Sequence, residues 1–254
     1  MVRLRREIEG LKRDHSKRIP DYLQSQHFRT ILDEMFADAI RQLDWEKGGR
    51  VLAVSPPLFL ARELLKEASH LTIVESDSER ASVLTKGLSD VADVRTLTIH
   101  EKVYSEISFE RSAFDLILSL DDLNAYFSPG NAVRKYGREL KVSGVFFGRI
   151  VLTEESCQEN KAGRWAVSQF EFEKESNGGF RLDSVERVLA SAMLVSKLSD
   201  RLPQLPVWAL RKMFQVSAGI DSRLSKRALS QVPAISYIHG GKALGFGSVF
   251  QVNK

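Results

Sequence analysis

Three acidic side chains stand where apolar runs of this chain end: Glu75, Asp121 and Asp122. Glu75 follows the run 71–74, and the two aspartates follow the run 114–120. A carboxylate at the end of a strand accepts both hydroxyls of a ribose, and a carboxylate beside a reacting hydroxyl acts as a base. By themselves, these positions predict a strand-end site with acids. The alternatives are a solvated strand-end acid for Glu75 and a helix N-cap for either aspartate.

A strand, a tight turn and a helix pattern follow one another between residues 49 and 64, and the turn contains no glycine. The apolar run 51–54 ends in Ser55-Pro56-Pro57, and a helical pattern begins at once. In open α/β sheets such a corner lies where a nucleotide-like ligand approaches the backbone, and glycines normally permit that approach. Prolines have no N–H to offer a ligand. We expect a modified ligand-binding corner, the alternative being a packed turn that has lost its ligand.

Strand and helix patterns alternate through the first two thirds of the chain. The expected strands are 51–54, 71–75, 94–99, 114–119 and 145–152, and the expected helices are 3–18, 28–43, 58–66, 78–88 and 131–140. Strands separated by helices of this length favour a parallel sheet with right-handed crossovers. The last third predicts a helix at 182–192, strands at 194–198 and 244–252, and a helical segment at 205–229 between them. We expect an α/β, Rossmann-like sheet, mostly parallel, with an antiparallel C-terminal edge and helices on both faces.

Laid in this order, the patterns resemble the class I S-adenosylmethionine-dependent methyltransferase superfamily from about residue 20 onward. The resemblance rests on five stretches in the right order: residues 51–59 at the first strand and turn, 71–77 at the second strand, 113–123 at the fourth strand, 138–145 at the L-K-P-G-G turn, and 182–193 at the helix before the sixth strand. The departures fall on the cofactor loop. Ala53 stands where the family has an acid, and Ser55, Pro57 and Phe59 stand where it has glycines. A phenylalanine there adds bulk that can fill the pocket.

The resemblance implies S-adenosylmethionine as the cofactor and assigns roles to strand-end residues. The implied cofactor-binding residues are Ser55, Leu58, Glu75, His100, Glu101 and Ser119. Glu75 takes the ribose hydroxyls in this assignment, and His100 or Glu101 stands where the family places an adenine-contacting acid. Asp121 and Asp122 lie beside the expected methyl donor as catalytic candidates. No metal is expected, because the five histidines are scattered and the fifth strand is followed by no clear ligand set.

Two functions from different classes follow. The first is methyl transfer, in line, to a positioned oxygen of a glycan, a lipid-linked or another small acceptor. The second is a catalytically inactive protein of this fold that serves as a partner-binding or membrane-surface scaffold. A third interpretation, in which Ser55-Pro56-Pro57-Leu58-Phe59 resembles the S-P-P-Y/F motif of amino-methylating nucleic-acid methyltransferases, is disfavoured. Only six residues follow Ser248, so no helix or ribose-binding acid can follow the supposed permuted cofactor turn near 245–248.

Charge and composition fit a cytoplasmic protein. Contact with an anionic membrane surface is expected only through its basic segments. The 254 residues are 43% hydrophobic and 28% charged, with no apolar run of membrane-spanning length and no secretory signal. Residues 1–19 hold seven basic and three acidic side chains, an excess equal to the +4 of the whole chain, and a second basic segment spans 211–227. Both segments suit peripheral membrane contact or a solvated face. Nucleic acid is not expected, because aromatic residues are not interleaved with the basic ones.

The sequence divides into an N-terminal helical extension (1–45), a methyltransferase-like core (46–200), a helical insertion (201–233) and a C-terminal edge strand of the core (234–254). The insertion is strongly apolar on one side, which suits a lid over a hydrophobic acceptor, a dimer surface or part of the core. Cys157 is the only cysteine and is expected to be an ordinary free thiol.

Overall fold

The computed structural model of the chain describes a nearly continuous stretch through the N-terminal half and several shorter pieces. The described residues are 33, 37, 40, 41, 43, 45–91, 96–123, 128–153, 167, 168, 205, 206, 208, 209, 212, 213, 216, 234–241, 248 and 249. The helices expected at 3–18 and 182–192, the strand expected at 194–198 and Cys157 lie outside them.

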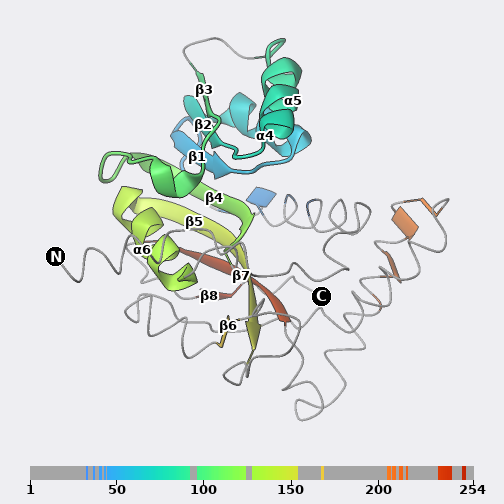
Figure 1. Cartoon of the computed structure of the whole chain (residues 1–254), viewed down its shortest axis with the longest axis vertical. Helices are drawn as coiled ribbons and strands as arrows, with labels where there is room; N and C mark the ends of the chain where they lie inside the picture. Colours follow the sequence, from blue (N-terminus) through green and yellow to red (C-terminus); the bar gives the residue numbers. More distant parts are fainter. Residues whose placement is uncertain are drawn as a thin grey trace.

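The strands among these residues form one sheet, in the order β3-β2-β1-β4-β5-β7-β8, with β6 pairing with β5 off this path (Figure 1). Their bounds are β1 Arg50–Val54, β2 His70–Val74, β3 Leu97–His100, β4 Phe114–Asp122, β5 Leu140–Thr153, β6 Val167–Ser168, β7 Ala234–Gly241 and β8 Ser248–Val249. β1 to β5 pair in parallel, whereas β7 runs antiparallel to both β5 and β8. The predicted Rossmann-like fold class is confirmed. The order reverses between β1 and β4, where ligands bind in open α/β sheets.

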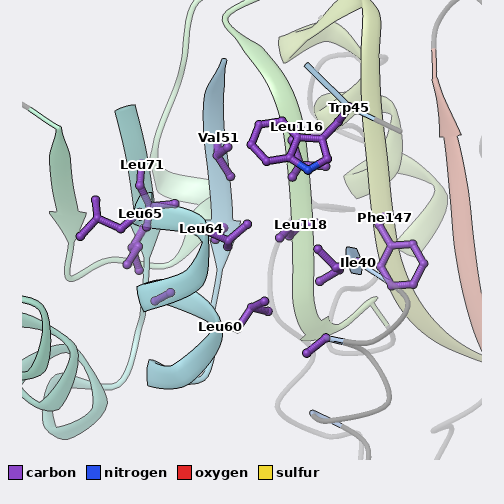
Figure 2. Packing of buried hydrophobic residues seen from close by; sticks show 14 of the residues in the cluster. Ile40, Trp45, Val51, Leu60, Leu64, Leu65, Leu71, Leu116, Leu118 and Phe147 are labelled. Atoms are coloured by element: carbon purple, nitrogen blue, oxygen red, sulfur yellow. The ribbon is translucent and has the colours of Figure 1, made fainter. Parts of the chain in front are cut away.

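Two helices and the N-terminal segment cover one face of the sheet. Helices α4 (Leu58–Glu67) and α5 (Ser78–Leu88) follow β1 and β2, and Figure 2 shows Leu60, Leu64 and Leu65 of α4 lying over the strands. Side chains along a strand point to alternate faces, so Val51 and Ala53 join this core. Each large apolar side chain buried here contributes about 1.5–3 kcal/mol to folding.

The opposite face of the sheet is covered by helix α6 (Pro129–Glu139) and the short 3₁₀ helix η1 (Tyr104–Glu106). Leu52 and Val54, the alternate residues of β1, belong to this second core. Its remaining buried members are Val74, Tyr104, Ile107, Ala113, Phe114, Ile117, Leu123, Ala132, Val133, Tyr136, Leu140 and Phe146. Strands buried on both faces explain why the parallel part of the sequence reads as nearly continuous apolar runs.

The N-terminal segment packs on the α4 side of the sheet. The described residues between 33 and 41 are helical, and Ala37, Ile40 and Leu43 are buried with Trp45 against this core. Figure 2 shows Ile40 and Trp45 on the same side as α4, next to Leu116, Leu118 and Phe147. Ile40 and Leu43, two described residues of the helix expected at 28–43, are therefore buried against the sheet.

Two expectations about element boundaries are wrong. β4 continues through Asp122 and does not end at 119, and Ser128 is the N-cap of α6, its hydroxyl accepting from the Asn131 N–H at 3.2 Å. Neither Asp121 nor Asp122 caps α6. β5 begins at Leu140 and not at residue 145, so the expected turn region is part of the strand. Its pairing with β4 shifts in register between Phe114 and Leu116. No helix among the described residues is long and apolar enough to cross a membrane.

Candidate functional site

Ser55, the first residue after β1, adopts a backbone conformation that glycine usually takes. Ser55 has a φ of +53°, in the left-handed region, and only 4% of the residue is exposed. Its N–H donates to the Val74 carbonyl at 2.9 Å, and its own carbonyl accepts from Arg80 Nη2 at 3.1 Å. The Ser55 hydroxyl is buried and has no hydrogen-bond partner among the described residues. A buried hydroxyl without a partner is costly, so a ligand atom at this point would be favoured.

The N-terminus of α4 points its free amides at the same edge of the sheet. Pro57 is its N-cap, with no side-chain hydrogen bond, and the first turn contains no acidic residue. An uncapped helix start leaves N–H groups and a partial positive charge for a ligand. Phe59 is 38% exposed, so its ring is not buried in the corner. Leu58 is half-buried, and its side chain packs beside Gly87 of α5.

Glu75 is a buried carboxylate at the end of β2. The residue is 1% exposed, and its Oε1 accepts from the Asp77 N–H at 3.0 Å. Arg80 Nε lies 3.4 Å from the other oxygen, Oε2. Asp77 also starts α5, because its side chain accepts from the Arg80 N–H at 3.0 Å. The predicted ribose acid is therefore held by the first turn of the helix that follows it.

The other predicted cofactor residues lie around this centre. The carbonyl of His100 accepts from the Glu75 N–H at 3.0 Å, which brings the ends of β2 and β3 together. The His100 ring meets Phe109 edge-on, 5.8 Å between centroids, and Glu101 is exposed. Ser119 lies on β4, on the other side of β1 from Glu75, where it pairs with Val54 and is fully buried.

The end of β4 carries the predicted catalytic acids. The backbone of β4 includes Asp121 and Asp122, and Asp122 pairs with Arg149 of β5 after a register shift. Both backbones therefore lie at the carboxyl edge of the sheet. The neighbouring Ser119 hydroxyl accepts from the Tyr136 hydroxyl at 3.3 Å, so its side chain is turned toward α6.

A buried polar cluster below this edge was missed by the sequence analysis. Lys135 Nζ donates to the carbonyls of Tyr104 and Ile107 at 2.8 Å and 2.5 Å, and lies 3.8 Å from the Tyr104 ring centroid. The Tyr104 hydroxyl donates to Glu139 at 2.5 Å, and Tyr104 stacks on Tyr136 with centroids 4.3 Å apart. The cluster ties η1, which follows β3, to helix α6.

Burial shifts the pKa of both charged groups in this cluster, Glu139 and Lys135. Desolvation raises the pKa of Glu139 above its ordinary value, and the Tyr104 hydrogen bond and the Lys135 charge lower it in part. Desolvation lowers the pKa of Lys135, and the charge of Glu139 opposes that shift. The one sequence signal was the spacing of Lys135 and Glu139, one turn apart on the face of α6 that also carries the buried Ala132 and Tyr136.

Three features of the described residues meet at this edge of the sheet. A left-handed turn after β1, a buried carboxylate after β2 and a buried hydroxyl without a partner are all at the carboxyl edge, at the point where strand order reverses. The structure brings Ser55 and Glu75 together through Arg80, and His100 through its backbone. Arg80 was not foreseen, although an arginine three residues after a helix-capping aspartate lies in the first turn over the strand ends. Among the described residues no three metal-binding side chains converge.

No protein-family model matches the chain, and no curated protein matches its sequence. Solved structures do match it in fold. Phosphoethanolamine N-methyltransferase 2 of Haemonchus contortus, solved with S-adenosyl-L-methionine, matches with a TM-score of 0.57 and 15% identity over 87% of this chain and 59% of its own length.

Two further structures match over most of both chains. The [4+2]-cyclase SpnF matches with a TM-score of 0.56 and 14% identity over 84% of this chain and 82% of SpnF. The protein MccD matches with a TM-score of 0.54 and 13% identity over 81% of this chain and 96% of MccD. Likeness at these identities is a likeness of fold. The chain therefore has a Rossmann-like, class I methyltransferase-like fold.

Proposed function

We propose that the chain is an S-adenosylmethionine-dependent methyltransferase that methylates an oxygen of a glycan, a lipid-linked or another small acceptor. The observation that carries the proposal is the buried Glu75 carboxylate beside the left-handed Ser55 at the carboxyl edge of the sheet. Phe59, which adds bulk at a position where the family has glycine, is 38% exposed and does not belong to the buried core of the corner.

Each residue of the edge has a task in this proposal. Glu75 accepts the ribose hydroxyls, and the Ser55 hydroxyl gains the partner that it lacks among the described residues. His100 or Glu101 borders the adenine, and Ser119 lies under the transfer point. When bound, S-adenosylmethionine supplies an electrophilic methyl group. Asp121 or Asp122 then takes the proton from the acceptor hydroxyl as it attacks in line.

Calorimetric titration with S-adenosylmethionine and S-adenosylhomocysteine tests the proposal. We expect micromolar binding, and we expect Glu75→Gln to weaken it at least about tenfold, because the amide replaces a double acceptor by a single one. Glu79→Gln is the matched control, an exposed acid in the first turn of α5, and it should bind as the wild type does. No heat at millimolar ligand would defeat the proposal and leave the inactive scaffold.

The scaffold has its own supporting observation. Pro56 is buried and Pro57 is the N-cap of α4, so two positions of the corner have no N–H for a ligand. SpnF, a cyclase of similar fold, illustrates that the fold alone does not fix the chemistry. An inactive protein would keep its sheet and use other surfaces.

Peripheral membrane contact belongs to either version of the proposal. Trp208, Lys212 and Val216 are helical residues spaced four apart, and all three are exposed, Trp208 by 70% and Val216 by 63%. An exposed tryptophan beside a lysine suits an interface with anionic lipid, and the segment would then act as a lid over a lipid-linked acceptor. Cosedimentation with anionic and with neutral vesicles tests this, and equal recovery with both would contradict it.

A further inference from the structure

Ser55 adopts a backbone conformation that serine seldom takes. Its φ of +53° is strain-free for glycine but unfavourable for a residue with a Cβ. Among the described residues, one other non-glycine residue, Ser112, has a positive φ, of +56°. Strained conformations of this kind persist only where the surroundings fix them. The question is therefore what fixes Ser55 in a corner that has no glycine.

Two hydrogen bonds hold the backbone of Ser55. Its N–H donates to the Val74 carbonyl at 2.9 Å, a bond that any residue except proline would make there. Its carbonyl accepts from Arg80 Nη2 at 3.1 Å, and this bond depends on one side chain. Arg80 Nε lies 3.4 Å from Glu75 Oε2, so a single guanidinium spans the β1 corner and the acid that ends β2.

The planar fork of arginine suits this double task, because it presents several donors in a fixed geometry. The Arg80 side chain is 44% exposed, so its charge pair with Glu75 is screened by water. The position of Arg80 is itself fixed, because its N–H donates to Asp77 at the start of α5. A substitution of its side chain therefore leaves the helix cap in place.

We propose that Arg80 is a positioning residue that does the work of the missing loop glycines. It holds Ser55 in the left-handed conformation and orients Glu75 at the mouth of the nucleoside site. The orientation of Glu75 rests on the proposed function. The support of Ser55 is a property of the chain alone and is tested without ligand.

A double-mutant cycle on thermal unfolding tests the support of Ser55. We expect Arg80→Ala to lower the unfolding midpoint by about 2–4 °C, and to lower it by less than half as much when Ser55→Gly is also present. The reason is that glycine holds the left-handed conformation without help. Equal losses in both backgrounds would overturn the proposal, because Arg80 would then act independently of Ser55.

The chain offers two matched controls for this cycle. Arg62 has a side-chain exposure of 43% and likewise donates to a backbone carbonyl, that of Gly87, and pairs with Asp90, but it lies away from the corner. Arg62→Ala should lower the midpoint equally with and without Ser55→Gly. Ser112→Gly removes the backbone strain at the second left-handed serine. It should leave the effect of Arg80→Ala on the unfolding midpoint unchanged.

Titration with S-adenosylhomocysteine tests the second half of the inference. We expect Arg80→Ala to weaken binding about tenfold and Arg80→Lys to weaken it less. Tighter binding by Arg80→Ala would overturn the inference, since Arg80 would then block Glu75. If the wild type itself does not bind, the proposed function fails, while the unfolding cycle still decides whether Arg80 supports the corner.

Discussion

At the scale of single residues, the most consequential side chain outside the edge of the sheet is Lys135. Its ammonium is buried, donates to two backbone carbonyls of the segment after β3, and lies over the Tyr104 ring. Hydrogen bonds from a charged donor contribute more than neutral ones, and they offset the cost of burying the charge. Lys135 therefore fixes the segment that continues from the predicted adenine contacts.

Replacing Lys135 tests this assignment. We expect Lys135→Met to lower the free energy of unfolding by about 2–3 kcal/mol, because two buried carbonyls lose a donor and Glu139 loses its nearby cation. Urea denaturation measures the change. Lys86→Met, at an exposed position of α5, should change stability by less than about 0.5 kcal/mol. Similar losses for the two variants would show that the buried hydrogen bonds of Lys135 do not stabilise the fold.

Glu139 makes stability depend on pH in a definite direction. Its pKa is raised in the folded chain above the ordinary value of 4.5, so its contribution is present below that pH and is lost as the pH rises through the folded pKa. Glu139→Gln removes this dependence. Between about pH 4 and about pH 7, the stability of the variant relative to the wild type should rise with pH. A flat difference for Glu139→Gln would contradict the shift.

The sequence could predict the candidate acids at the edge but not the side chains that organise them. Glu75 was predictable because an acid after a buried strand has few other places to lie. Arg80 and the Lys135 cluster depend on contacts between residues 25 or more apart in the chain, which no local pattern records.

At the scale of elements, the start of β1 depends on a close approach between two strands. A Cβ added to Gly49 would lie 2.7 Å from the Cβ of Asp115 on β4. Asp115 cannot move away easily, because it is buried and accepts from the Arg50 N–H and from Lys141 Nζ, each at 2.8 Å. Gly48 differs, since it has a φ of +82° and open space around it.

These two adjacent glycines give a paired prediction. We expect Gly49→Ala to lower the free energy of unfolding by about 1–3 kcal/mol through the clash with Asp115. Gly48→Ala should lower it by about 1 kcal/mol, through backbone strain alone. Chemical denaturation of both variants measures the difference. A larger loss at Gly48 would mean that the Asp115 contact yields more easily than its hydrogen bonds imply.

Element boundaries were predictable where a local signal decides them. The helix predicted at 78–88 is α5 to the residue, because Asp77 caps its first turn. The end of β4 was not predictable, because pairing with the long β5 carries the strand through Asp121 and Asp122 despite their low strand propensity. The strand β7 (Ala234–Gly241) was not recognised as separate from the strand expected at 244–252, where β8 now lies. It too is fixed by long-range pairing with β5.

At the scale of the whole molecule, the sheet order places the two halves of the proposed site on different strands that are neighbours in space. β1 and β2 carry the corner and the ribose acid, and β4, on the other side of β1, carries the candidate base. The alternation of strands and helices predicted this class of sheet, because parallel strands need crossover helices.

A ligand that binds only the folded sheet must stabilise all of it. At S-adenosylhomocysteine concentrations of about 100 times the dissociation constant, we expect the free energy of unfolding to rise by about 2.7 kcal/mol. The unfolding midpoint should rise by about 5–10 °C. Differential scanning fluorimetry with and without ligand measures the shift, with adenosine-free buffer and Glu75→Gln as controls. An equal shift in Glu75→Gln would place the ligand elsewhere.

The enclosed ammonium of Lys135 has a practical consequence. Amine-reactive reagents modify exposed lysines quickly, but they can reach Lys135 only when α6 lifts from the segment at 104–107. Its labelling rate, followed by mass spectrometry, therefore reports how often that side of the sheet opens in the folded protein.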